Sequence, residues 1–250
     1  MIKLKTQEEI AIMQEAGRRL RKVMMQLLPQ IKPGVTTQLI DKKAEELIIK
    51  LGGQPSFKRV KNYSWATCLP INEQIVHTPP SMRKLKNGDI LTIDIGFYLG
   101  GFHTDHALTI IVGDKEDPKV VKFLNTGKKT LEKALAKVKT GNYLGEVSKT
   151  IEEEIEKAGY HVVQELTGHG IGHDLHEDPL VPGLLEGSLD KTYKIKPGLV
   201  IAVEVIYAMG TSRMKFEKGS EWSIVTVDGS LSACFEHTIA ITKEGSIVLT

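Results

Sequence analysis

Residues 194–206 read KIKPGLVIAVEVI, and residues 84–96 read KLKNGDILTIDIG. In each stretch two lysines and a glycine precede a run of aliphatic residues that carries an acid, Glu204 or Asp94, six residues after the glycine. Runs this rich in β-branched residues predict central strands. The shared lead-in and the shared position of the acid indicate that the chain contains a repeated unit.

Two further echoes support the repeat. The pattern acid-His-x-aliphatic-x-Ile occurs at residues 105–110 and again at 236–241, while Lys-Pro-Gly at 32–34 is matched by Lys-Thr-Gly at 139–141. Each half therefore holds two helices followed by two strands that each contain an acid. We predict one α/β (α+β) domain, with a duplicated αβ unit and pseudo-twofold symmetry. The domain spans residues 1–250, with repeats at approximately 1–115 and 116–250.

The spacing of apolar residues, together with capping residues and prolines, predicts where the helices begin and end. The first helix begins after Thr6, a typical N-cap, and ends before Pro29 and Pro33. The other helices are predicted at residues 37–51, 117–139 and 144–158. An apolar stripe marks the buried face of the first helix: Ile10, Met13, Gly17, Leu20, Met24 and Leu27. The basic residues beside this stripe are interpreted as a solvated face: Arg18, Arg19, Arg21 and Lys22. Leu99-Gly100-Gly101 and Asp228-Gly229 are interpreted as hairpin turns.

Bulk composition excludes several classes of protein. The 250 residues carry 33 basic and 31 acidic side chains, and the net charge of +2 gives no indication that the protein binds nucleic acid. The two cysteines, Cys68 and Cys234, offer neither a disulfide framework nor a zinc-finger spacing. The N-terminus lacks the apolar stretch of a signal peptide, and no window is long enough to span a membrane. We expect a cytoplasmic protein that binds neither membrane nor nucleic acid.

The acids of the repeated strands predict a metal site. An isolated carboxylate in a central strand is costly to bury unless it is paired, protonated or bound to a cation. Four acids at symmetry-related positions would repel one another, and two divalent ions would resolve that repulsion. The alternative is that each acid makes its own salt bridge or points outward. That alternative is favoured for any single acid, but it is disfavoured for four acids on strands that the repeat relates.

A histidine-rich segment strengthens this hypothesis. Residues 168–177 read GHGIGHDLHE, so that three imidazoles lie within eight residues among glycines that allow close backbone approach. At least one of these histidines is predicted to join the carboxylate site. The HExxH motif is absent, which argues against a simple mononuclear zinc protease.

With these motifs the chain resembles type I methionine aminopeptidases over nearly its whole length. The most specific matches are Ile93-Asp94 with Asp105 eleven residues on, GHGIGHDLHE, and LSACFEHT at residues 231–238. The resemblance implies the pita-bread fold, in which a curved antiparallel sheet is covered by helices. It also implies two divalent metal ions (Co, Mn, Fe, Zn or Ni) and removal of N-terminal methionine before a small second residue. Peptides and nascent chains would be substrates, the ribosome is left open as a partner, and a monomer is expected.

Carried over by position, the resemblance implies a role for each site residue. Asp94 and His169 would bind different metals, Asp105 and Glu236 would bridge them, and Glu204 would complete the second metal's ligands and carry the proton. His77 and His176 would contact the substrate. The pocket for the methionine side chain would be lined by Tyr63, Cys68, Leu175 and Trp222.

Four positions depart from the family pattern without removing a ligand: Thr78, His106, Leu175 and Val205. Thr78 and Leu175 affect the expected pocket shape. The remaining histidines near the site are interpreted as outer groups and not as ligands: His103, His106, His173 and His237. Two alternatives stay open, namely an Xaa-Pro aminopeptidase or dipeptidase on the same fold, and a metal-free binding module.

Overall fold

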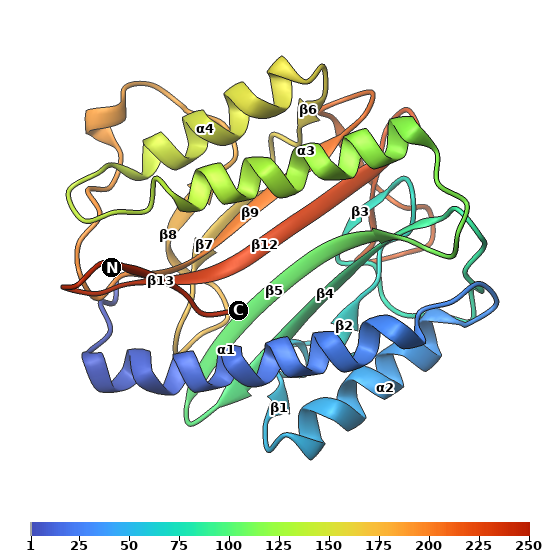
Figure 1. Ribbon diagram of the computed structural model, residues 1–250, viewed down its shortest axis with the longest axis horizontal. Helices are drawn as coiled ribbons and strands as arrows, with labels where there is room; N and C mark the ends of the chain where they lie inside the picture. The colour runs from blue at the N-terminus through green and yellow to red at the C-terminus, as the bar shows by residue number, and fades with distance from the viewer. Residues whose placement is uncertain (1) are drawn as a thin grey trace.

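The computed structural model describes residues 2–250, which form one large antiparallel sheet with helices against one face (Figure 1). The ten strands of this sheet follow the order β1-β4-β5-β12-β9-β7-β8, and β2, β6 and β13 pair with β4, β9 and β12. Its strands are β1 (Gln54–Pro55), β2 (Thr67–Cys68), β4 (Ile90–Leu99), β5 (Phe102–Ile111), β6 (His161–Val162), β7 (Thr167–Gly170), β8 (Glu177–Pro182), β9 (Val200–Ala208), β12 (Ser232–Ile241) and β13 (Ser246–Val248). A smaller sheet is ordered β10-β11-β3, from β10 (Met214–Phe216), β11 (Ile224–Thr226) and β3 (Gln74–Val76).

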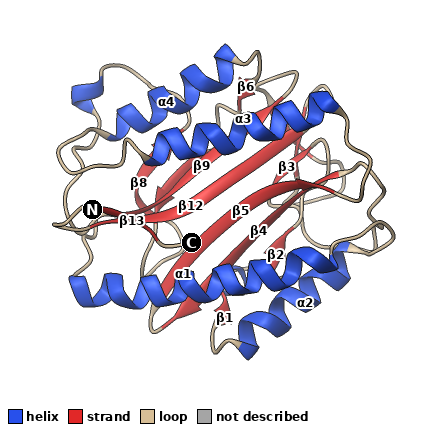
Figure 2. Ribbon diagram, viewed as in Figure 1, coloured by secondary structure: helices blue, strands red, loops and turns tan. Residues whose placement is uncertain are grey.

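Four long helices cover one face of the large sheet, two over each half (Figure 2). They are α1 (Gln7–Leu27), α2 (Thr37–Lys50), α3 (Pro118–Leu135) and α4 (Leu144–Lys157). One core cluster packs α1 and α2 against β4, and another packs α3 and α4 against β9 and β12. No helix within residues 2–250 is long and apolar enough to cross a membrane. The mixed α/β class with a helix-covered antiparallel sheet is therefore confirmed.

The two halves meet where β5 pairs with β12 at the centre of the sheet. Their internal registers differ by two residues, because Asp94 lies opposite Ala107 in the first half whereas Glu204 lies directly opposite Glu236 in the second. The chain passes from one half to the other between Ile111 and Pro118. The two halves therefore each contribute two long strands and two helices but differ in strand register, and the repeat bounds stay a prediction.

The helix boundaries follow the local chemistry closely. Thr6 caps α1 in a reciprocal capping box with Glu9, and the predicted apolar stripe is buried throughout. Asp117 is the N-cap of α3 and not its first residue, and α3 ends at Leu135, four residues before the predicted end. Arg18, Arg21 and Lys22 of α1 are exposed, whereas Arg19 is half-buried and donates to the Leu51 carbonyl at 2.8 Å; Arg18 and Arg19 share the carboxylate of Glu15.

One of the two predicted hairpins is correct. Gly100 and Gly101, both with positive φ, join β4 to β5, and Leu99 pairs with Phe102 across the turn. The prediction for Asp228-Gly229 was wrong. These residues turn the chain between β11 and β12, but the two strands belong to different sheets. A turn dipeptide fixes the local reversal and leaves open which strands pair afterwards.

Gly17 is the point at which α1 packs against the C-terminal segment. A Cβ added to Gly17 would lie 2.3 Å from the carbonyl oxygen of Leu249. We expect Gly17→Ala to lower the free energy of unfolding by about 1–3 kcal/mol, because overpacking outweighs the better helix propensity of alanine. Urea unfolding measures this. Gly145→Ala in α4 is the control with a smaller loss, because its nearest neighbours are the side-chain atoms of Leu185 and Thr192. An unfolding midpoint at or above that of the unchanged protein would show that α1 accommodates the added methyl group without loss of stability.

Candidate metal centre

Strand alternation places all four carboxylates on the face of the sheet that the helices leave open. In β4, for example, Ile93 and Ile95 pack under α1 and α2, so the intervening Asp94 points to the opposite side. The same alternation acts in β5, β9 and β12. The spatial strand order β4-β5-β12-β9-β7 then carries the predicted ligands in the order Asp94, Asp105, Glu236, Glu204 and His169. Among the four carboxylates Asp105 and Glu236 are the inner two: Asp105 lies between Asp94 and Glu236, and Glu236 lies between Asp105 and Glu204.

This array is buried and incompletely paired. Asp94 Oδ1 and Glu236 Oε1 are buried oxygen atoms without a hydrogen-bond partner among the described residues. Burial raises the pKa of Asp105 to about 7, and it raises the pKa values of Asp94, Glu204 and Glu236 well above their usual range. Repulsion between neighbouring carboxylates adds to the shifts of these three groups. Such a cluster is costly to keep charged without a cation.

His169 contributes an imidazole that is prepared to bind a cation. Its Nδ1 lies 2.8 Å from the carbonyl oxygen of Gly170, so Nδ1 donates that proton and Nε2 is left with a free lone pair. The same Nε2 lies 3.4 Å from Glu204 Oε1. Burial, reinforced by the nearby His176, lowers the pKa of His169 to about 3, so the ring is neutral at neutral pH. A neutral imidazole with one fixed tautomer is the form that ligates metals.

The residues fit a divalent-metal site. Ligand atoms of Asp105, His169 and Glu236 lie within 4.8 Å of one another, and all three residues are buried. Two orphaned acceptor oxygens and a mixed set of carboxylates with one imidazole suit divalent cations such as Mn, Fe, Co or Zn. Asp94 lies beside this group on β4, and Glu204 lies within it on β9, between the strands of Glu236 and His169.

A cavity of about 110 Å³ lies over the carboxylates, and every predicted site residue lines it. The predicted lining residues are Tyr63, Cys68, His77, Asp94, Asp105, His169, Leu175, His176, Glu204, Trp222 and Glu236. Four more residues complete the wall and were not predicted: Phe57, Val60, Val76 and Cys234. Cys234 could have been found, because it lies two residues from Glu236 on the same strand face. The other three lie outside the long strands and carry no comparable pattern.

The apolar side of the cavity is held rigidly. The Tyr63 hydroxyl donates to the Thr67 carbonyl at 2.9 Å and lies 3.2 Å from Cys68 Sγ, and the Tyr63 ring meets Trp222 edge-on at 5.1 Å. Asp41 anchors the same segment by accepting from the backbone of Ala66 and Thr67. These contacts fix the wall that faces the carboxylates.

Two histidines stand at the exposed part of the cavity. His77 has φ of 56°, a left-handed conformation that is uncommon for a residue other than glycine, and such strain often accompanies function. The hydroxyls of Thr78 and Ser223, 2.8 Å apart, hold the next residue in place. His176 lies with its ring 4.5 Å from that of His169. Both His77 and His176 are exposed to solvent, unlike the carboxylates below them.

The four histidines that were interpreted as outer groups lie outside the cavity. His106 and His237 stack 4.6 Å apart on the helix-covered side, and His106 Nδ1 lies 2.6 Å from the carbonyl oxygen of Glu236. His103 contacts Ser56, and His173 is exposed. None of the four lines the cavity. Their interpretation as outer groups agrees with these positions.

Buried carboxylates and an imidazole on the floor of a largely apolar cavity define a metal-dependent hydrolase. The chain belongs to Metallopeptidase family M24, whose sequence profile matches residues 11–243. It is 42% identical over 250 residues to methionine aminopeptidase 1 of Bacillus subtilis, covering 100% of this chain and 99% of that protein. It is 36% identical to the methionine aminopeptidase of Aquifex aeolicus, with coverage of 100% and 98%.

Solved structures confirm the pita-bread fold. The crystal structure of methionine aminopeptidase from Thermotoga maritima superposes with a TM-score of 0.95 at 37% identity, covering 100% of this chain and 99% of that one. Prolidase from Pyrococcus furiosus gives a TM-score of 0.77 at 23% identity, and the match covers 99% of this chain but 65% of the prolidase. The likeness to prolidase is one of fold alone.

Proposed function

We propose that this chain is an aminopeptidase that removes N-terminal methionine from peptides and nascent proteins. The observation that supports this most strongly is the convergence of the five predicted ligands and the apolar wall on one cavity of about 110 Å³. A cavity of that size accepts one side chain and leaves the rest of a peptide outside. Full-length identity to methionine aminopeptidases supports methionine as that side chain. A small second residue is part of the proposal, as the family resemblance implies.

We assign the metal ligands by position across the sheet. Asp94 and Asp105 would hold one ion, His169 and Glu204 would hold a second ion, and Glu236 with Asp105 would be shared between them. The central strands β5 and β12 support this sharing, because their acids neighbour the groups on either side. Two divalent ions would polarise the scissile carbonyl and lower the pKa of the attacking water.

The chain's own residues would orient the substrate and move the proton. Burial and the neighbouring Asp105 raise the pKa of Glu204, so this carboxylate is suited to accept a proton and release it to the leaving amine. His77 and His176 would hydrogen-bond the peptide around the scissile bond, since they alone among the predicted residues of the cavity combine exposure with donor nitrogens. Tyr63, Leu175 and Trp222 would enclose the methionine side chain.

A peptide panel tests the substrate. We expect Met-Ala-Ser to be cleaved after methionine when Mn, Fe or Co is supplied, and Ala-Ala-Ser to be cleaved with kcat/KM at least about tenfold lower, because alanine leaves the apolar wall uncovered. Xaa-Pro peptides with a first residue other than methionine are the comparison for the prolidase alternative. Cleavage confined to Xaa-Pro bonds would overturn the proposal. Asp105→Asn protein, prepared in parallel, controls for contaminating peptidases.

A further inference from the structure

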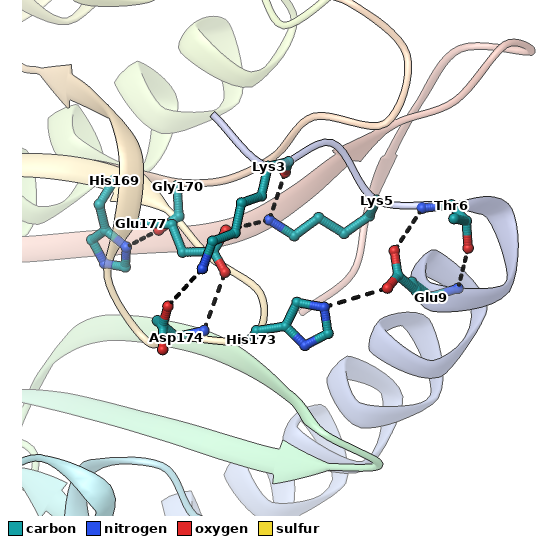
Figure 3. Close-up of polar contacts among 9 residues, drawn as sticks. All are labelled: Lys3, Lys5, Thr6, Glu9, His169, Gly170, His173, Asp174 and Glu177. Carbon is teal, nitrogen blue, oxygen red and sulfur yellow. Dashed lines mark hydrogen bonds and ion pairs between the residues drawn. The ribbon is translucent and has the colours of Figure 1, made fainter. Parts of the chain in front are cut away.

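The N-terminal segment, residues 3–9, lies against the loop that joins β7 to β8 (Figure 3). Three side-chain contacts connect them: Lys3 with Asp174 at 2.9 Å, Lys5 with Glu177 at 2.5 Å, and Glu9 with His173 at 3.3 Å. The first joins two exposed groups, and the third joins the exposed His173 to the half-buried Glu9. In contrast, the side chains of Lys5 and Glu177 are 2% and 3% exposed. Lys5 is the only buried lysine or arginine in the described part of the chain.

Lys5 and Glu177 each make a further hydrogen bond beside their ion pair. Lys5 Nζ also donates to the carbonyl oxygen of Lys3 at 3.0 Å, and Glu177 Oε1 accepts from the backbone N–H of Asp174 at 3.1 Å. The Lys5 stem packs on Gly172, where an added Cβ would lie 2.1 Å from Lys5 Cε. The backbone N–H of Lys5 donates to Gly198 at 2.7 Å, which fixes the segment to the start of β9. The lysine therefore occupies one defined position against the loop.

Glu177 connects this contact to both imidazoles of the site. Its chain neighbour is His176, at the exposed part of the cavity. Its backbone pairs with Gly170, and the Gly170 carbonyl orients Nδ1 of His169. The loop makes one further hydrogen bond between these points: the backbone N–H of His103 donates to the carbonyl oxygen of Gly172 at 2.8 Å. The carboxylate of Glu177 is thus the side chain through which the N-terminal segment reaches the end of the loop.

Stability alone does not account for a buried ion pair at this position. The desolvation of two charges offsets most of their attraction, so well-packed apolar residues serve the fold equally well. A charge-assisted contact adds directional geometry that apolar packing lacks. Catalytic groups need such restraint, because a displacement of about 1 Å can cost on the order of 10²-fold in rate.

We propose that Lys5 and Glu177 are positioning residues, and that their buried ion pair holds the β7–β8 loop so that His176 faces the scissile peptide. The role rests on the proposed peptidase function, in which His176 contacts the substrate. Neither Lys5 nor Glu177 lines the cavity. Lys5 and Glu177 therefore act through His176 and not on the substrate.

The test uses Lys5→Met and Glu177→Gln, two variants that each remove one charge with little change of shape. We expect kcat for Met-Ala-Ser to fall by roughly 10–10²-fold while KM changes by less than about threefold, because the orientation of a transition-state contact is lost. In a His176→Ala background, Lys5→Met should cause no further loss of kcat. A full additional loss in that background would overturn the proposal, as would unchanged kcat in both single variants.

Lys3→Met and Asp174→Asn are the matched controls, because they break an exposed contact between the same segment and the same loop. We expect their kcat to stay within about twofold of the unchanged enzyme. Hydrogen exchange gives a readout that needs no activity: amides of residues 170–177 should exchange faster in Lys5→Met and Glu177→Gln than in the controls. Unchanged exchange overturns the positioning role. Faster exchange in a protein that cleaves no methionine peptide would refute the proposed function and leave the restraint intact.

Discussion

Asp105→Asn and Glu236→Gln are each expected to abolish peptidase activity and to weaken divalent-metal binding. Both residues lie on the central strands β5 and β12, and in the proposed assignment both are shared, so either substitution would remove a ligand from both ions. The loss in kcat/KM should exceed the roughly 10²–10³-fold that removal of one transition-state hydrogen-bond donor costs. Titration calorimetry with Mn²⁺, together with the Met-Ala-Ser assay, measures both effects.

The control for these variants is Asp89→Asn. Asp89 is a buried carboxylate outside the cavity that accepts from Asn72 Nδ2 at 3.0 Å and from the Lys86 backbone at 2.8 Å. Its loss should lower the free energy of unfolding without changing metal affinity. Metal binding at normal affinity in both Asp105→Asn and Glu236→Gln would contradict the shared-ligand assignment.

Metal-free protein is expected to lose stability as the pH rises, and Asp105→Asn should remove part of this dependence. Burial raises the folded pKa of Asp105 to about 7, whereas an unfolded aspartate titrates near 3.8. Between these values the folded state holds a proton that the unfolded state releases, so raising the pH favours unfolding. The loss of stability is absent below about pH 4 and grows to roughly 4 kcal/mol by pH 7.

The measurement is the difference in unfolding free energy between Asp105→Asn and the unchanged protein in chelator, from pH 4.5 to 7.5. Taking the difference cancels the opposing contributions of buried histidines such as His169, whose lowered pKa destabilises the fold as the pH falls. We expect Asp105→Asn to gain stability relative to the unchanged protein as the pH rises. Saturating Mn²⁺ should make the unchanged protein the more stable of the two. A difference in unfolding free energy that does not change across this range would show that burial does not raise the pKa of Asp105.

The long strands and the acids on them could be predicted because two signals agreed. Aliphatic runs marked β4 and β9, and the repeat tied Asp94 to Glu204 and Asp105 to Glu236. Helix ends were accurate where a cap fixes them, as at Thr6, and less so at the end of α3, where no glycine or proline stops the pattern until Gly141. Local chemistry sets such boundaries, and a single sequence carries that chemistry directly.

Contacts between segments far apart in the chain could not be predicted in the same way. The pairing of β5 with β12 depends on how the halves close, and no turn motif records it. The left-handed backbone of His77 and the contact of Lys5 with Glu177, 172 residues away, result from packing of the completed fold. For the same reason Asp228-Gly229 was correctly interpreted as a turn and wrongly assigned to a hairpin.

The order of ligands across five strands has a consequence for how this protein is synthesised. Asp94 is made early, whereas Glu236 is made after the other four predicted ligands, and it lies on the strand between those of Asp105 and Glu204. A growing chain therefore lacks the middle of the sheet until β12 has been translated. A product that stops before β12 lacks Glu236 and the strand that joins β5 to β9, so we expect it to show neither metal binding at this site nor peptidase activity.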